Sequence, residues 1–229
     1  MTLHEMIYHR KSCRSFTGQP VNAEMMEKIL NFDLKPLYPE INVRMDIVSR
    51  AQVKCICPWT TPQLIAIYSE EKTGYLENIG FLFQQMDLYL QTLGLGVCWL
   101  GMGRMNPKTT TAVEGMKFVI LLAFGHPKGD QLRHDGKGFK RKSMAQITDR
   151  EDPRLEPARL APSAVNSQPW YFTHEGDTIG VYCSKKGSRL DAGIAMAHLY
   201  AANPESFRFF RTKNETEIPG YGYIGSVTL

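Results

Sequence analysis

A loop between two prolines carries the polar groups best suited to hold a ligand. Pro162 and Pro169 fix the backbone and lack an N–H, and residues that precede proline favour extended conformations. The run between them is therefore expected to be a shaped loop rather than a helix. Hydroxyls and amides here both donate and accept hydrogen bonds, and small residues keep the loop thin: Ala161, Ser163, Ala164, Asn166, Ser167 and Gln168. A planar ligand with polar edges would fit such a loop. An Asn/Ser/Pro-rich surface turn is the alternative.

A cationic segment near the N-terminus is the second group of residues that could do chemistry. It carries three cations and two hydroxyls within six residues: Arg10, Lys11, Ser12, Arg14 and Ser15. Arginine offers a planar fork of donors that matches phosphate, and lysine adds a point charge. The segment predicts an anion site, with a solvated, charged helix end as the alternative.

Other kinds of reactive site find little support. The sequence contains no HExxH pattern, and no Ser-His-Asp set or carboxylate pair can be assigned among its scattered residues. The five cysteines are irregularly spaced and are interpreted as reduced thiols. Cys55 and Cys57 lack the further ligands that a tetrahedral metal site requires, so no metal is expected.

Composition limits the class of protein. The chain has 229 residues and a formal charge of +4, which argues against the concentrated basic face of a nucleic-acid-binding protein. It lacks an apolar run of 18 residues, and its first residues lack the apolar core of a signal peptide. A cytoplasmic protein that binds neither a membrane nor nucleic acid is therefore expected.

Hydrophobic periodicity predicts that the chain contains both helices and strands. We expect helices over residues 2–9, 21–32, 75–93 and 194–202, and strands over 43–49, 63–69, 117–125, 180–184 and 207–211, with further strands beginning at 97 and 170. In the second helix Met25, Met26, Ile29 and Leu30 are expected to face inward. Residues 219–223 are expected to have little regular structure.

The proline loop resembles the flavin-contacting loop of the FMN-dependent nitroreductase superfamily. The matching pattern is Ala-Pro-Ser-Ala-x-Asn-x-Gln-Pro-Trp over residues 161–170. Arg-Lys-Ser-x-Arg-x-Phe over residues 10–16 is similar to the phosphate- and ribityl-binding start of that superfamily. Gly-Leu-Gly-x-x-Trp-Leu-Gly over residues 94–101 resembles the segment near the flavin pyrimidine edge and N5. The resemblance implies these FMN contacts: Arg10, Lys11, Ser12, Arg14, Leu100, Gly101, Met102, Arg141, Pro162, Ser163, Ala164, Asn166 and Gln168.

The superfamily also places basic phosphate ligands after a late strand like that over residues 117–125. The cations that follow here are Lys128, Arg133, Lys137, Lys140, Arg141 and Lys142, and the sequence does not distinguish among them. A mobile, solvated loop is the alternative for most of these side chains.

The resemblance implies an α+β fold in which helices flank a central, mostly antiparallel sheet. It also implies an oxidoreductase in which NAD(P)H reduces FMN and a nitroaromatic, a quinone or a similar acceptor reoxidises it by a ping-pong mechanism. Two alternatives stay open. One is a flavin-binding carrier or sensor without turnover, and the other is a degenerate homologue whose empty pocket serves as an interaction surface.

The order of the motifs departs from the superfamily pattern, since the proline loop follows the central helix instead of preceding it. Arg141-Lys142-Ser143 repeats Arg10-Lys11-Ser12, and the helix start at 190–194 repeats that at 77–81. This arrangement resembles the TM nitroreductase subgroup and suggests a fused pseudo-dimer. The halves would be residues 1–135 and residues 136–229, the latter carrying the flavin loop. A monomer is expected, with a homodimer as the alternative.

Overall fold

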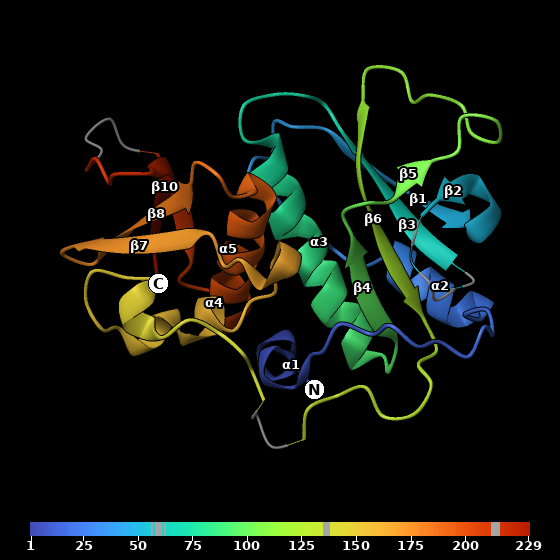
Figure 1. The fold of residues 1–229 in the computed structure, drawn as a ribbon, viewed down its shortest axis with the longest axis horizontal. Coiled ribbons are helices and arrows are strands. Elements are labelled where there is room, and N and C mark those ends of the chain that lie inside the picture. Colours follow the sequence, from blue (N-terminus) through green and yellow to red (C-terminus); the bar gives the residue numbers. More distant parts are fainter. Residues whose placement is uncertain (56, 58–60, 62, 135–137, 212–215) are drawn as a thin grey trace. The chain divides into compact units, whose positions relative to one another are not determined.

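The computed structural model describes the chain except residues 56, 58–60, 62, 135–137 and 212–215. Two compact units are present. The first contains Met1–Tyr75 and Met86–Lys137, and the second contains Leu76–Gln85 and Gly138–Leu229. Each unit has its own four-stranded antiparallel sheet (Figure 1). The expected α+β fold of antiparallel sheets and helices is confirmed.

The sheet of the first unit has the strand order β1-β3-β6-β4. Its strands are β1 (Val43–Ser49), β3 (Gln63–Ser69), β4 (Gly96–Leu100) and β6 (Lys117–Gly125). A separate two-stranded sheet pairs β2 (Val53–Lys54) with β5 (Arg104–Met105). The helices that begin in this unit are α1 (Leu3–His9), α2 (Ala23–Leu30) and α3 (Tyr75–Thr92), and a 3-10 turn covers Arg50–Gln52.

Helix α1 starts with a capping box. The Thr2 hydroxyl accepts a hydrogen bond from the Glu5 N–H at 3.1 Å, and the Glu5 carboxylate accepts one from the Thr2 N–H at 2.8 Å. Both bonds satisfy N–H groups that find no partner within the helix. The helix ends at His9, so the chain passes directly into the cationic segment.

Helix α2 corrects one prediction about the core. Ile29 is fully buried, but Leu30 is 51 % exposed and does not face inward. Consecutive residues of a helix point about 100° apart, and this helix has only eight residues. Its buried stripe is therefore too narrow to contain both side chains.

One face of the first sheet is covered by an apolar cluster. Its buried members come from the four strands and from β2: Val48, Val53, Leu64, Ala66, Tyr68, Cys98, Leu100, Leu121 and Ala123. Cys55 and Cys57 are partly buried against this cluster. Packing in this cluster therefore fixes the position of β4, the strand that carries Leu100.

The sheet of the second unit has the order β7-β8-β10-β9. Its strands are β7 (Trp170–Glu175), β8 (Thr178–Ser184), β9 (Arg208–Phe210) and β10 (Tyr221–Thr228). Helices α4 (Glu156–Arg159) and α5 (Arg189–Ala202) belong to this unit, with 3-10 turns at Met144–Gln146, Pro153–Leu155 and Ala164–Asn166.

Strand β10 overturns the expectation of an irregular segment at residues 219–223. It pairs with β8 on one side and β9 on the other, with a bulge between Tyr223 and Gly225. The expectation rested on Gly220 and Gly222, which are typical of turns. Further along the strand, Gly225 lies against the Phe209 ring, where a side chain would collide. The glycine here permits close packing within a strand instead of ending it.

The two units share one topology. In each, two strands pair, a helix follows in sequence, and two more strands complete the sheet in the order first-second-fourth-third. The helices concerned are α3 and α5. The internal repeat noticed in the sequence therefore has a counterpart in the connection of the elements.

Helices α3 and α5 meet at two glycines within the second unit (Figure 1). Gly80 lies against the Leu190 backbone, and Gly193 lies against the Glu77 backbone. The two contacts are equivalent under one shift of 113 residues, since 193 − 80 and 190 − 77 are equal. Reciprocal contacts of this kind are typical of two elements related by a two-fold axis.

Candidate functional site

The cationic segment at residues 10–16 runs beside β4 in the first unit. Ser12 forms a parallel bridge with Val97, and the Cys13 N–H donates to the Val97 carbonyl at 2.8 Å. Gly96 permits this approach, because a Cβ there would lie 2.5 Å from the Cys13 Sγ. The cationic segment and β4, which both carry predicted FMN contacts, are therefore bonded to each other through their backbones.

The loop after β6 also lies along the cationic segment. The Lys128 N–H donates to the Ser15 carbonyl at 2.9 Å. Further along, the Arg133 N–H donates to the His9 carbonyl at 2.8 Å, and the His9 Nδ1 lies 2.6 Å from the Arg133 carbonyl. Among the six cations that the sequence left undecided, Lys128 and Arg133 therefore border the cationic segment. Lys137 lies outside the described residues.

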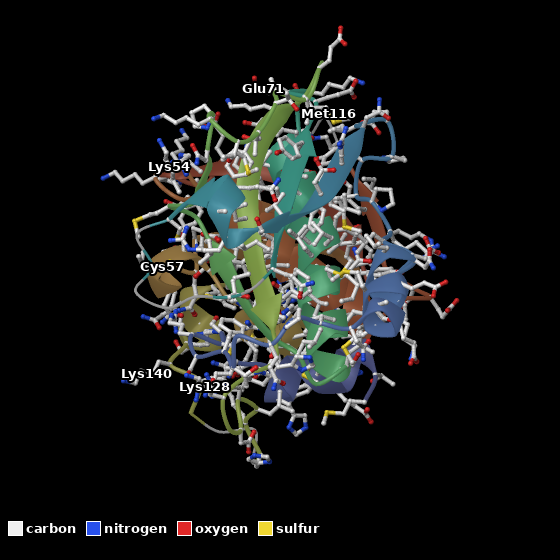
Figure 2. All side chains as sticks on the ribbon, turned by 90° about the vertical axis from the view of Figure 1, so that its right-hand side faces the viewer. Lys54, Cys57, Glu71, Met116, Lys128 and Lys140 are labelled. Carbon is white, nitrogen blue, oxygen red and sulfur yellow. The ribbon has the colours of Figure 1, made fainter. Side chains whose placement is uncertain are left out.

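Positive charge accumulates at this place. Lys11, Arg14 and Lys128 are exposed, and Figure 2 shows Lys128 at the end of the first unit opposite Glu71 and Met116. Burial and the nearby Arg10 guanidinium lower the pKa of Arg133, so two arginines of like charge are close together. Asp130 is an acidic neighbour, and the charge of Lys11 contributes to the lowering of its pKa. An anion would stabilise this arrangement.

Arg10 itself is buried and forms an ion pair. Its Nε donates to the Asp87 carboxylate at 3.0 Å, and its exposed fraction is 2 %. Gln91 donates to the same carboxylate at 2.7 Å and accepts from the Lys11 N–H at 3.1 Å. These bonds fix the cationic segment on α3.

The turn after β4 presents Gly101 and Met102 to the solvent, whereas Leu100 is buried. Met102 is 67 % exposed, which is unusual for a large apolar side chain. Nothing lies within 4 Å of a Cβ placed on Gly101, so the backbone of this turn is open to a ligand.

The proline loop of the second unit has a strained backbone. Val165, Asn166 and Gln168 have positive φ angles of 46°, 58° and 46°. Residues other than glycine rarely adopt such angles, and a β-branched valine is the least suited to them. Val165 is also 99 % exposed. Strain of this kind persists only where the surrounding structure enforces it, and it is concentrated at functional sites.

Hydrogen bonds within the loop and to α5 enforce the loop conformation. The Gln168 N–H donates to the Ser163 Oγ at 2.9 Å. The Ala164 N–H donates to the buried Asp191 carboxylate at 3.2 Å. Burial raises the pKa of Asp191 to about 6, and the bond from Ala164 opposes that rise.

The loop amides also hold the 140–142 segment. The Asn166 Oδ1 accepts from Arg141 at 2.8 Å, and the Gln168 Oε1 accepts from the Lys142 N–H at 2.7 Å. Exposed at the loop tip are Ala164, Val165, Asn166 and Ser167, with Ser163 half-buried, while Pro162 and Gln168 are buried. The second unit thus presents a rigid tip of small and apolar residues.

In the part of the chain that the structure describes, three or more His, Cys, Asp or Glu side chains nowhere gather as a metal site would require. The described helices include none with the length and apolarity needed to cross a bilayer.

The family comparison agrees with this set of features. The model of a family described as "Putative TM nitroreductase" matches residues 2–203, which is most of the chain. The chain belongs to this nitroreductase family. Nitroreductases are oxidoreductases, and the resemblance inferred from the motifs is confirmed at the level of the family. No curated protein matches the sequence.

Solved structures of other nitroreductases share the fold. A protein described as a "putative nitroreductase" from Thermotoga maritima is 20 % identical, with a TM-score of 0.69, and the alignment covers 99 % of this chain and 92 % of that one. A nitroreductase family protein from Clostridium difficile is 15 % identical, with a TM-score of 0.51 and coverage of 64 % and 96 %.

Three residues that build this nitroreductase's candidate site were not singled out from the sequence: Asp87, Gln91 and Asp191. Asp87 and Gln91 lie one turn apart in the apolar helix α3, and both are buried. Polar residues four apart within an apolar helical pattern are a signal that could have revealed this pair. Asp191 gave a weaker signal as an acid in the first turn of α5.

Proposed function

We propose that the chain is an FMN-dependent oxidoreductase that passes electrons from NAD(P)H to a nitroaromatic, a quinone or a similar acceptor by a ping-pong mechanism. The observation that carries this proposal is the proline loop, which holds three non-glycine residues at positive φ and exposes Val165 almost completely. A strained loop with an exposed apolar tip has the properties of a preorganised binding surface.

The cationic segment supports the phosphate part of the proposal. Lys11, Ser12 and Arg14 would bind the FMN phosphate together with Arg133, whose charge is close to that of Arg10. Arg10 would contribute to the positive field while its ion pair with Asp87 fixes the segment.

The remaining predicted contacts would face the flavin ring. Leu100, Gly101 and Met102 would supply backbone amides and an apolar surface from the turn after β4. Pro162, Ser163 and Ala164 would supply a thin, mostly apolar surface from the proline loop. Asn166, Gln168 and Arg141 bond to one another, so their role would be to shape that loop.

Bound FMN would supply the electron-transfer chemistry. The protein would bind the phosphate, orient the ring and leave one ring face open to the donor and the acceptor. Because the flavin would supply the chemistry, the mechanism requires no catalytic acid, base or nucleophile from the chain.

The absorbance spectrum of the purified protein, with and without added FMN, tests the proposal. We expect a yellow protein that NADH or NADPH bleaches under anaerobic conditions and that a quinone or nitroaromatic recolours. A yellow protein that neither nucleotide bleaches would indicate a carrier or sensor. A colourless protein that takes up no FMN would indicate a degenerate homologue.

The variant Arg14→Gln tests the phosphate contact, and we expect FMN affinity to fall at least about tenfold. Loss of one charge-assisted hydrogen bond costs about 1.5–3 kcal/mol. Lys117→Gln is the matched control, because Lys117 lies at the start of β6 whereas the cationic segment lies beside the loop that follows this strand. The two ends of β6 are roughly 27 Å apart. Equal FMN affinities of the two variants would contradict the assignment of Arg14.

A further inference from the structure

Two of the five cysteines lie side by side in the first unit, just after β2. A hydrogen bond joins the two thiols, whose Sγ atoms are 3.0 Å apart. The Cys57 N–H also donates to the Cys55 sulfur at 3.4 Å. A disulfide bond is about 2.05 Å long, so the sulfurs need to approach by only about 1 Å to become bonded.

Cys55 and Cys57 are also more accessible to solvent than the other three cysteines. Cys55 and Cys57 are half-buried at the edge of the apolar cluster, whereas the other thiols, Cys13, Cys98 and Cys183, are at most 5 % exposed. Figure 2 shows Cys57 at the side of the first unit from which Lys54 also projects. A small reagent in solution therefore reaches this pair before the other cysteines.

We propose that Cys55 and Cys57 are a dithiol site that small disulfides, such as oxidised glutathione, convert reversibly into an intramolecular disulfide. The inference does not depend on FMN or on the proposed electron transfer.

The contacts assign different roles to the two sulfurs. Cys55 is the attacking sulfur, because it accepts a hydrogen bond from the Cys57 backbone N–H, which favours a thiolate. The Arg50 guanidinium lies beside it and donates to the Cys55 carbonyl at 2.9 Å. Cys57 is the resolving thiol. Burial and the neighbouring Cys55 raise its pKa to about 11, so it retains its proton until the mixed disulfide has formed.

The exchange takes place in two balanced steps. The Cys55 thiolate attacks one sulfur of oxidised glutathione, forms a mixed disulfide and releases one glutathione thiolate. Cys57 then loses its proton, attacks the Cys55 sulfur and releases the second glutathione. The two protein thiols are oxidised, one glutathione disulfide is reduced, and reduced glutathione in excess reverses both steps.

One tryptic peptide reports the outcome. Cleavage after Lys54 and Lys72 releases residues 55–72, which contain both cysteines of the pair and none of the others. FMN-free protein is incubated with oxidised glutathione, alkylated and digested. We expect this peptide to lack both alkyl groups and two hydrogen atoms, and to recover both alkyl groups after treatment with reduced glutathione.

Two serine variants separate the roles. Cys57→Ser is expected to accumulate one glutathionyl group on Cys55, because no resolving thiol remains. Cys55→Ser is expected to react several-fold more slowly, and Cys13→Ser serves as a control that forms the disulfide normally.

Two results would overturn the inference. One is a fully alkylated 55–72 peptide after incubation with oxidised glutathione, in protein whose circular dichroism shows that it is folded. The other is a first disulfide that involves Cys13, Cys98 or Cys183. Neither result bears on whether the protein binds FMN, which the absorbance spectrum measures separately.

Discussion

Arg10 illustrates how a cation that was predicted to bind a ligand can also stabilise the protein. The sequence pattern assigned it to phosphate, and the structure pairs it with Asp87, which is completely buried. A buried carboxylate without its partner is costly, because it has lost water without gaining a counter-charge. The stability of the first unit should therefore depend on Arg10 even in the absence of FMN.

We expect Arg10→Met to lower the free energy of unfolding of the FMN-free protein by about 3–5 kcal/mol, because Asp87 stays buried without its counter-charge. The double variant Arg10→Met/Asp87→Leu should lose much less than the sum of the two single variants. Urea denaturation of all four proteins measures the coupling energy.

The exposed pair Lys28–Glu24 on α2 is the control for that cycle. Its atoms approach to 2.8 Å, yet both side chains are more than half exposed. Water screens such pairs, so the equivalent cycle should show little coupling. Additive effects at Arg10 and Asp87 would contradict the structural role of their ion pair.

A cluster around His174 shows how single residues fasten one segment to a sheet. The His174 imidazole lies 2.6 Å from Asp149 and 3.1 Å from Asp152, and Asp152 also accepts from Arg154 at 2.7 Å. Thr148 forms a parallel bridge with Phe172 in the same place. The cluster thereby fixes the chain before α4 along the edge of β7.

This cluster predicts a loss of stability in acid. Hydrogen bonds from Arg154 chiefly lower the pKa of Asp152 to about 2, compared with an ordinary value near 4. A lowered pKa means that the contribution to stability is present above pH 4 and disappears as the pH falls through about 2. Between pH 5 and pH 2.5, the free energy of unfolding measured by denaturation should decrease less for Asp152→Asn than for the unmodified protein.

Glu205→Gln is a suitable comparison for the acid experiment, since Glu205 is exposed in a turn of the same unit. Its pH dependence should follow that of the unmodified protein. If Asp152→Asn also follows the unmodified protein, the cluster does not contribute to acid stability.

At the scale of elements, the contact between α3 and α5 depends on two glycines. Alanine in place of an exposed helical glycine usually stabilises by about 1 kcal/mol. At Gly80 the added methyl group would meet the Leu190 carbonyl, which is backbone and cannot rotate away. We therefore expect Gly80→Ala to destabilise the protein by at least about 1–3 kcal/mol, as measured by thermal or urea unfolding.

Gly193→Ala should behave in the same way, because it meets the Glu77 carbonyl. Gly222→Ala is the control, since the nearest atom to its added Cβ would be the Cys183 carbonyl oxygen at an ordinary 4.0 Å. A stabilising effect of alanine at Gly80 or Gly193 would show that the two helices are not in close contact there.

Elements with a clear period could be predicted from the sequence, and several boundaries were correct. The strand at Val43–Ser49 and the strand at Lys117–Gly125 have the predicted limits. Strand β10 was missed because its glycines suggest turns in a local reading. Their role becomes visible only through the strands on either side.

The candidate site was less accessible to sequence reasoning, for a physical reason. Residue types and spacing indicated the cationic segment and the proline loop. They could not show that Asn166 and Gln168 bond to the 140–142 segment, because such contacts join residues about 25 positions apart. The placement of Arg133 beside His9 joins residues that are 124 positions apart.

At the scale of the whole molecule, the shared topology of the two units supports the hypothesis of a fused pseudo-dimer. We propose that the chain acts as a monomer with one FMN. Light scattering of the FMN-loaded protein should give a mass near 26.0 kDa, and the flavin absorbance should correspond to one FMN per chain. An obligate dimer with FMN shared between two chains would contradict the monomer.

Helix α3 contributes residues to both units, and this has a consequence for synthesis on the ribosome. Residues 76–85 of that helix belong to the second unit, although the elements before and after them belong to the first. A nascent chain that has emerged as far as residue 137 therefore displays a helix face whose partner, α5, has yet to be translated. Chaperones that recognise apolar surface should bind at this stage, and a fragment that ends at residue 137 should be prone to aggregate.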